Sequence, residues 1–190
     1  MKKSIALVMM AVLLVAASVM GTLAYLTSTD NVTNTFTVGK VAITLDEADV
    51  DVYGAPIENA ARVRANEYKL IPGHEYTKDP TVHFAAGSEA SWLFVKVENG
   101  IANIEADKKI ADQIIDNHWT ALTGVDGVYY KQVDANTGAA AIDYPVFETF
   151  KLDGEADVSK YANAAVKVTA YAIQADGFTT PDAAWAKFSN

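Results

Sequence analysis

The residues of this sequence with the widest chemical use are its three histidines, and the first begins a stretch that resembles a zinc-protease motif. That stretch is HEYTK, from His74 to Lys78. In H-E-x-x-H, two imidazoles one helical turn apart reach the same metal. Lys78 holds the second ligand position, and the preceding Pro72-Gly73 favours a turn followed by a strand. His83 lies nine residues from His74, which places it on the opposite face of a strand. We therefore expect no catalytic zinc.

Other reactive groups are no better placed. Asp49 and Asp51 would share one face of a predicted strand, and their hard oxygens could hold Ca²⁺. The calcium-loop pattern with its glycine and terminal Glu is absent, and charges at a strand edge also discourage unwanted pairing, so we favour solvated charges. The sequence has no cysteine, no G-x-S-x-G elbow and no phosphate-binding loop. It predicts no enzyme, cofactor site or metal site.

The first 24 residues have the features of a cleavable signal peptide. Lys2 and Lys3 precede the uncharged apolar run 4–20, which reaches the upper signal-peptide range and is slightly short for a bilayer span. Small residues two apart, at Thr22 and Ala24, predict cleavage between Ala24 and Tyr25. A retained N-terminal anchor is the alternative. Membrane contact is expected only through the uncleaved leader.

Charge and composition limit the partners of the mature chain. Loss of residues 1–24 removes two lysines and no acid, so the formal net charge changes from −9 to −11. Such a chain repels phosphate backbones, and we expect no nucleic-acid binding. An exported chain without cysteine must be stabilised by packing and hydrogen bonding alone, and the mature length is sufficient for such a core.

The elements that follow the leader are predicted to be mostly strands. Alternating apolar residues or turn signals mark the segments 41–45 with its extension to 53, 74–84, 91–100, 119–122, 128–133, 146–152 and 165–175. The turn 124–127 joins two of them as a hairpin. Pro80 suits an edge strand or a bulge better than a central strand.

Two short helices are predicted among these strands. One lies within 103–117, where Ile104, Ile110, Ile114 and Ile115 have helical spacing. The other begins after Thr180, a suitable N-cap, with Pro181 at its first position. Residues 57–66 form either a short helix or a polar connection.

These elements predict a mainly β fold for residues 41–190. Several short strands separated by turns favour a two-sheet antiparallel sandwich, with a jelly-roll-like topology preferred. Trp92, Trp119 and Trp185 lie in apolar-periodic elements, which indicates core or core-rim positions. A sugar-binding platform would instead need exposed aromatic residues.

Several motifs resemble the TasA/camelysin-like family, the exported substrates of a SipW-type signal peptidase. Gly21-Thr22-Leu23-Ala24 is similar to the family's cut site, and Asn34 to Gly39 to its N-x-F-x-x-G turn before the first strand. KLIPGHEYTKDPTVHF, residues 69–84, and WLFVKVE after it resemble a second recurring piece. The resemblance is specific over about 18–47 and 69–98.

The resemblance implies an extracellular jelly-roll subunit of a biofilm matrix or surface fibre, from a Gram-positive bacterium. Its partners would be the signal peptidase, further copies of itself and other matrix proteins. TasA, the member that gives the family its name, assembles by donating its N-terminal strand. The equivalent here would be the extended segment 25–40, with Val32, Phe36 and Val38 as candidate donor residues. A cell-surface module that binds carbohydrate or a host protein is the alternative. The family's metallopeptidase label comes third, because no metal-ligand motif supports it.

Overall fold

The longest strands of the computed structural model are those with the clearest apolar alternation. β4 (Ser91–Asn99) and β9 (Val166–Gln174) pair antiparallel along their whole length. β6 (Val128–Val133) pairs with the other side of β4, and β5 (Thr120–Ala121) pairs with β6. The result is a four-stranded sheet in the order β5-β6-β4-β9.

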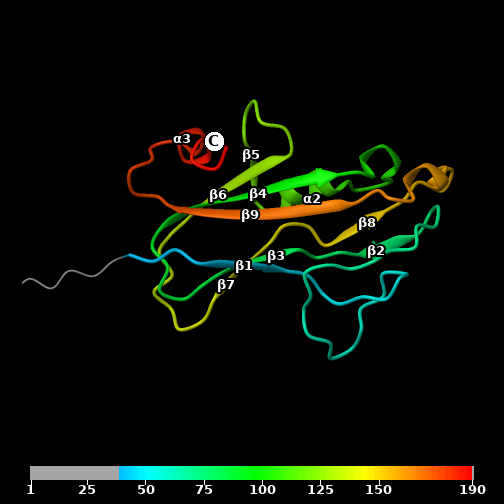
Figure 1. Ribbon diagram of the computed structural model, residues 1–190, viewed down its shortest axis with the longest axis horizontal. Coiled ribbons are helices and arrows are strands. Elements are labelled where there is room, and N and C mark those ends of the chain that lie inside the picture. The colour runs from blue at the N-terminus through cyan, green and yellow to red at the C-terminus, as the bar shows by residue number, and fades with distance from the viewer. Residues whose placement is uncertain (1–38, 190) are drawn as a thin grey trace, which may run out of the picture. The chain divides into compact units, whose positions relative to one another are not determined.

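Two smaller sheets lie opposite this one (Figure 1). β1 (Ile43–Asp46), β3 (Thr81–Phe84) and β7 (Ile142–Pro145) form one; β2 (Glu75–Thr77) and β8 (Thr149–Lys151) form the other. The β2–β8 pair continues the register of the β3–β7 pair. Across the gap the Val146 N–H donates to Pro80 O at 2.9 Å, and the Lys78 N–H to Glu148 O at 3.0 Å. The two smaller sheets therefore act as one layer.

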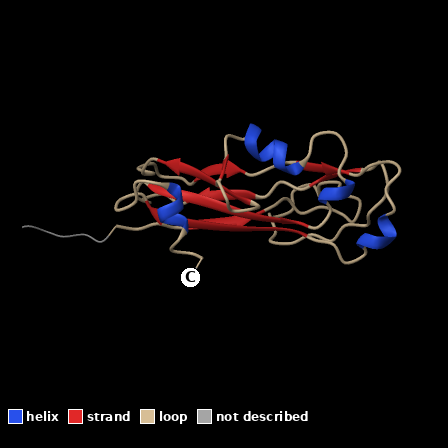
Figure 2. Cartoon of the chain, turned by 90° about the horizontal axis from the view of Figure 1, so that it is seen from above, coloured by secondary structure: helices blue, strands red, loops and turns tan. Residues whose placement is uncertain are grey.

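The main core lies between these layers. Leu93, Val95 and Val97 point from one face of β4 toward it and are almost fully buried, as is Phe147 from the facing layer. The opposite face of β4 carries Trp92 and Phe94 under the C-terminal helix α3 (Pro181–Trp185), where Trp185 covers a second cluster. Most strands of both layers lie roughly along one common axis when seen from above (Figure 2).

The helices are short, as the sequence predicted. α3 begins with Thr180 as N-cap, whose Oγ1 accepts the Ala183 N–H. α2 (Ile110–Asp116) follows the 3₁₀ turn η1 (Ala102–Ile104), and a second 3₁₀ turn, η2 (Val158–Tyr161), precedes β9. Ile115 is 49% exposed, so its predicted place on the apolar helix face was wrong. Gln113 is buried instead and bonds to Thr149 O at 2.8 Å.

The mainly β, antiparallel character of the prediction is confirmed, with differences in detail. The described strands form three hydrogen-bonded sheets where two were predicted. The first strand ends at Asp46 instead of continuing to residue 53, because Glu47 pairs with Val63 and a turn follows. The predicted strand 146–152 is only β8, and β7 before it was missed. Residues 57–66 form a connection without a helix.

The structure describes residues 39–189. The predicted leader 1–24, the cleavage between Ala24 and Tyr25, and the donor residues Val32, Phe36 and Val38 lie outside the described residues. Within the described part, no helix is long and apolar enough to cross a membrane.

Candidate functional site

The candidate site is a groove between two edge strands, β1 and β9, which belong to different layers. In β9 the odd-numbered residues direct their backbone groups to β4, as shown at its N-terminal end, where Ala165 O accepts the Gly100 N–H. The even-numbered residues from Val166 to Ala172 therefore direct their N–H and C=O groups away from the sheet. Among residues 39–189 these groups have no hydrogen-bond partner.

The edge of β1 has the same property. Ala42 O accepts the Ala85 N–H, so the even-numbered residues of this segment face β3. Val41, Ile43 and Leu45 direct their backbone groups outward, and within the described range no partner is found for them. Cα atoms of β1 and β9 approach within 8 Å of each other. Two strand edges able to form further ladder hydrogen bonds thus lie side by side.

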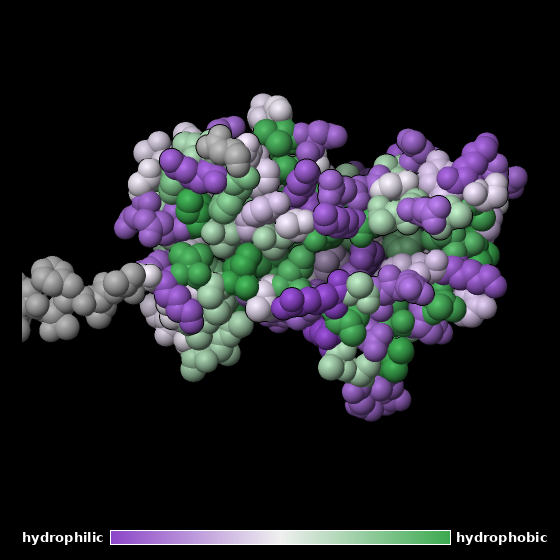
Figure 3. Space-filling view, viewed as in Figure 1, coloured by the Kyte–Doolittle hydropathy of each residue, from purple (hydrophilic) through white to green (hydrophobic). Residues whose placement is uncertain are grey.

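Apolar side chains form the floor of this opening, and charged side chains such as Asp46, Arg64 and Lys167 lie around it. Ile43, Leu45, Val166, Val168 and Ala170 line a groove of about 630 Å³, and all five are half-buried against the main core. Figure 3 shows hydrophobic residues gathered between the β9 layer and the β1 layer on this face. The small side chain of Ala170 leaves space above it. The groove therefore combines an apolar floor with unpaired backbone, which suits an extended peptide.

A buried ion pair forms one wall of the groove. Lys78 Nζ lies 2.5 Å from Glu47 Oε2, with side chains 10% and 6% exposed. The other carboxylate oxygen of Glu47 accepts a hydrogen bond from Asn66 Nδ2 at 2.9 Å, and its backbone pairs with Val63. Glu47 thus ties the segment 63–66 to the end of β1.

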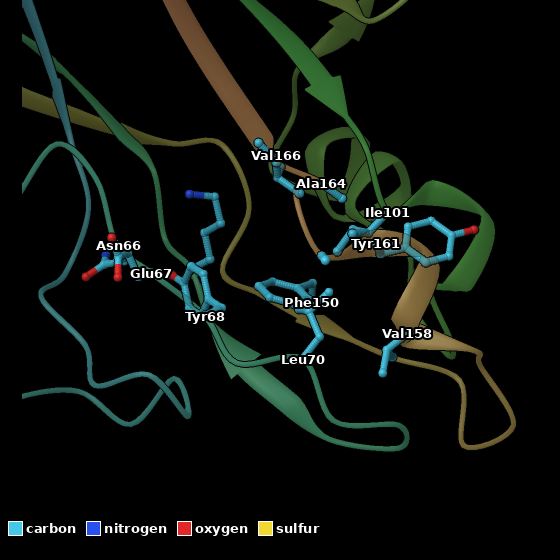
Figure 4. A pocket seen from close by; sticks show the side chains of 13 residues that line it. Asn66, Glu67, Tyr68, Leu70, Ile101, Phe150, Val158, Tyr161, Ala164 and Val166 are labelled. Atoms are coloured by element: carbon cyan, nitrogen blue, oxygen red, sulfur yellow. The ribbon is translucent and has the colours of Figure 1, made fainter.

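A pocket continues the groove beyond this wall. It has a volume of about 530 Å³ and shares Asn66, Lys78, Ala165 and Val166 with the groove. Figure 4 shows that the apolar part of its lining comes from four parts of the chain. The residues are Tyr68, Leu70, Ile101, Phe150, Val158 and Tyr161. We call it the aromatic pocket.

The aromatic floor of this pocket is fixed by its neighbours. The ring of Tyr68 lies 5.3 Å from that of Phe150, edge to face, and its hydroxyl donates to Thr77 O at 3.0 Å. Burial raises the pKa of Tyr68, and the nearby charge of Glu47 adds to this effect. The hydroxyl is therefore a neutral donor at physiological pH, and the pocket presents ring faces and aliphatic groups to a ligand.

The predicted chemical residues are not brought together. His74 Nε2 lies 2.8 Å from Tyr53 O. His74 itself precedes β2, whereas His83 lies in β3, with Nδ1 2.6 Å from Asp143 and Nε2 2.9 Å from Asp46. In the described part of the chain, no group of three or more His, Cys, Asp or Glu could hold a metal ion.

His83 and its two carboxylates link three strands of one layer. Burial opposes the charged imidazolium, but the hydrogen bonds and charges of Asp46 and Asp143 outweigh it, so the pKa of His83 is raised. Burial likewise opposes ionisation of Asp46, yet His83 and Arg62 outweigh it and lower the pKa of that carboxyl. Because these charges are satisfied by one another, we interpret His83, Asp46, Asp143 and Arg62 as a structural charge network.

Asp49 and Asp51, the two carboxylates that the sequence placed on one strand face, do not lie in a strand. Asp51 Oδ1 accepts the N–H groups of Tyr53 and Ala55, each at 2.9 Å, and Asp49 does not share a strand face with it. The three tryptophans are buried, as predicted, at 9% exposure or less. Sequence reasoning missed the groove and the aromatic pocket, because their walls come from segments far apart in the chain. The alternation of small and apolar residues in β9 was the one available signal.

No family model matches the chain, and no curated protein or solved structure matches it either. The similarity to the TasA/camelysin-like family therefore stays a prediction based on the motifs quoted above.

Proposed function

We propose that the chain is an exported structural protein that assembles into fibres by strand donation. A SipW-type signal peptidase would remove residues 1–24, and the segment 25–40 of one copy would add to the β1–β9 groove of the next. One observation carries the proposal. Two strand edges with unpartnered backbone groups, within residues 39–189, flank a groove with an apolar floor.

Strand addition satisfies both features of the groove at once. An extended segment supplies ladder hydrogen bonds to the edge, and every second side chain enters the apolar floor. Val32, Phe36 and Val38 have the same parity, and Asp30 is the only charged residue between Tyr25 and Val38. A long exposed edge without such a cover would be an aggregation site. Covering it in a defined register favours ordered assembly over aggregation.

The spacing of the edges adds a mechanical requirement. A strand that pairs on both sides needs about 9.5 Å between its neighbours, twice the normal strand separation. Cα atoms of β1 and β9 approach within 8 Å, which is less than this spacing, so the edges must part before one strand can pair with both. β1 has four residues and β9 has nine, so we expect that moving β1 requires less free energy than moving β9. We therefore take β9 as the main acceptor edge.

The wider proposal includes a jelly-roll topology for the two layers and an extracellular location at the cell surface or in a biofilm matrix. Other matrix proteins are proposed as additional partners. These elements rest on the motif resemblance and on the predicted leader.

The first test is deletion of residues 25–35 from the purified mature protein. We expect electron microscopy to show no fibres with the deletion and fibres with the full mature chain. Fibres of normal length from the deleted protein would refute strand donation.

The second test addresses the acceptor edge. Ala170→Lys places a charge in the groove, and should block assembly. Thr169→Lys adds the same charge to the opposite face of β9 and serves as the matched control. We expect fibres from the control alone, with both variants folded by circular dichroism. Equal assembly of the two would argue against this edge as the acceptor.

A surface module that binds carbohydrate is the second candidate, because the aromatic pocket offers Tyr68 and Tyr161 as stacking surfaces. A glycan array with the mature chain tests it. Saturable binding that Tyr161→Ala abolishes, without any fibre formation, would favour this candidate.

A further inference from the structure

The aromatic pocket lies at the opposite end of the domain from the point where the described chain begins. Gly39 lies beside Glu89, and Lys40 O accepts the Glu89 N–H, just before β4 starts. The pocket contains Ile101, just after β4 ends, and Val166, the partner of Asn99. β4 has nine residues, so the two ends are separated by about 30 Å. Figure 1 shows the first described residues before β1 and the turn before β9 at opposite ends of the domain.

This separation decides which aromatic residue of the N-terminal segment can reach the aromatic pocket of its own chain. Only Tyr25 and Phe36 are aromatic between residues 25 and 38. Phe36 lies three residues before Gly39 and can extend at most about 11 Å from it. It therefore cannot reach the aromatic pocket of its own chain. Tyr25, fourteen residues before Gly39, has enough chain to do so.

We propose that Phe36 of a second copy of this chain occupies the aromatic pocket and fixes the register of strand donation. The proposal rests on the proposed function and names the side chain that anchors the donated strand. Rings and aliphatic side chains line the side of the pocket formed by Tyr68, Phe150 and Tyr161, and polar side chains, Lys78 among them, line the end that joins the groove. The apolar side offers a phenyl ring the contacts that it requires.

The anchor sets the direction of the donated strand. Because Phe36 is close to Gly39, the second copy must place its Gly39 end against the pocket end of the first. Its upstream residues then run back along β9, antiparallel to it. With Phe36 beside Val166, Val32 falls beside Ala170. Residues directly opposite in an antiparallel pair share a face, so both donor side chains enter the groove.

The register also agrees with the backbone groups that are available. Val166 and Ala170 belong to the even-numbered set of β9 whose N–H and C=O groups point to the groove. Phe36 and Val32 would thus form hydrogen-bonded pairs with them. Repetition of the same head-to-tail contact gives an open linear polymer, because no symmetry axis closes it.

The test measures the critical concentration for assembly of the mature chain by sedimentation. Phe36→Ala should raise it about 10- to 100-fold, the effect of losing one buried phenyl group. Thr35→Ala is the control, since its side chain points away from the groove, and should change the value less than 3-fold. Unchanged assembly of Phe36→Ala would overturn the anchor. If the wild-type chain forms no fibres, or if deletion of residues 25–35 leaves them intact, strand donation fails instead.

A second measurement locates the side chain directly. Benzoylphenylalanine at position 36 should crosslink to the segments that line the pocket of another copy, which are 66–70, 158–166 and the peptides that contain Ile101 or Phe150. Mixed heavy- and light-isotope chains identify such crosslinks by mass spectrometry. Crosslinks elsewhere, or crosslinks within one chain, would overturn the proposal. So would a pocket filled by Tyr25 of the same chain, detected when the photoreactive residue is placed at position 25.

Discussion

Removal of one charge from the Glu47–Lys78 pair should destabilise the domain strongly. The 2.5 Å contact joins side chains that are only 6% and 10% exposed, so neither partner regains full hydration when the other is neutralised. Glu47→Gln preserves an oxygen that can accept the Asn66 hydrogen bond and so removes mainly the charge. Lys78→Met preserves the length of the stem. Each change should cost about 3–5 kcal/mol.

The assay is thermal and urea unfolding of the mature protein. A loss of 3–5 kcal/mol should lower Tm by roughly 6–20 °C in a chain of this length. Lys108→Met is the control, because Lys108 and Asp116 are also 2.5 Å apart but are 57% and 60% exposed. That pair should be worth less than about 1 kcal/mol.

The double variant Glu47→Gln/Lys78→Met separates charge burial from packing. It leaves no uncompensated charge, so its cost should fall below the sum of the two single costs by about 2 kcal/mol. Single variants that are as stable as Lys108→Met, or strictly additive costs, would refute the reasoning. Either result would mean that water reaches the pair.

Three further predictions concern stability. Trp119→Phe removes an indole N–H that donates to a backbone carbonyl at 2.8 Å, and it should cost about 1–3 kcal/mol in urea unfolding. Trp92→Phe removes a buried N–H that has no partner in the described structure, and it should be nearly neutral. Equal costs for the two variants would contradict this prediction. Gly127→Ala should cost several kcal/mol by calorimetry, because the residue has a φ of +67° and the new Cβ would lie 2.6 Å from the carbonyl oxygen of Val97. Gly124 also has a positive φ, +77°, but open space around it, so Gly124→Ala should cost only about 1 kcal/mol. Because the pKa of His83 is raised in the folded state, its charge stabilises the protein fully below the unfolded pKa of about 6.5, and this effect is lost as pH rises through the folded pKa. The Tm of the wild-type protein should therefore exceed that of His83→Gln by less at pH 9 than at pH 5. A constant difference would refute the charge assignment.

The elements with strong local signals could be predicted from the sequence. β4 and β9 alternate over nine residues each, and the turn 124–127 marks the hairpin of β5 and β6. Thr180 and Pro181 mark the start of α3. In each case the signal and the structure depend on neighbours within a few positions along the chain, so a single sequence contains the necessary information.

The elements that depend on distant partners could not be predicted. β7 has mostly exposed residues and exists because it pairs with β3, some sixty positions earlier. Residues 47–53 alternate like a strand but turn, since Asp51 captures two backbone N–H groups and Glu47 is held by Lys78. The aromatic pocket combines residues near 68, 101, 150 and 161, whose proximity no local pattern reveals.

If the chain assembles as proposed, the placement of Gly39 and the aromatic pocket at opposite ends of the domain would give the polymer two unlike tips. One terminal subunit would have an unoccupied groove, and the other would have a tail with nothing to enter. Growth at the two tips would then differ in rate, and a short synthetic copy of the tail would act as a chain terminator at one tip only.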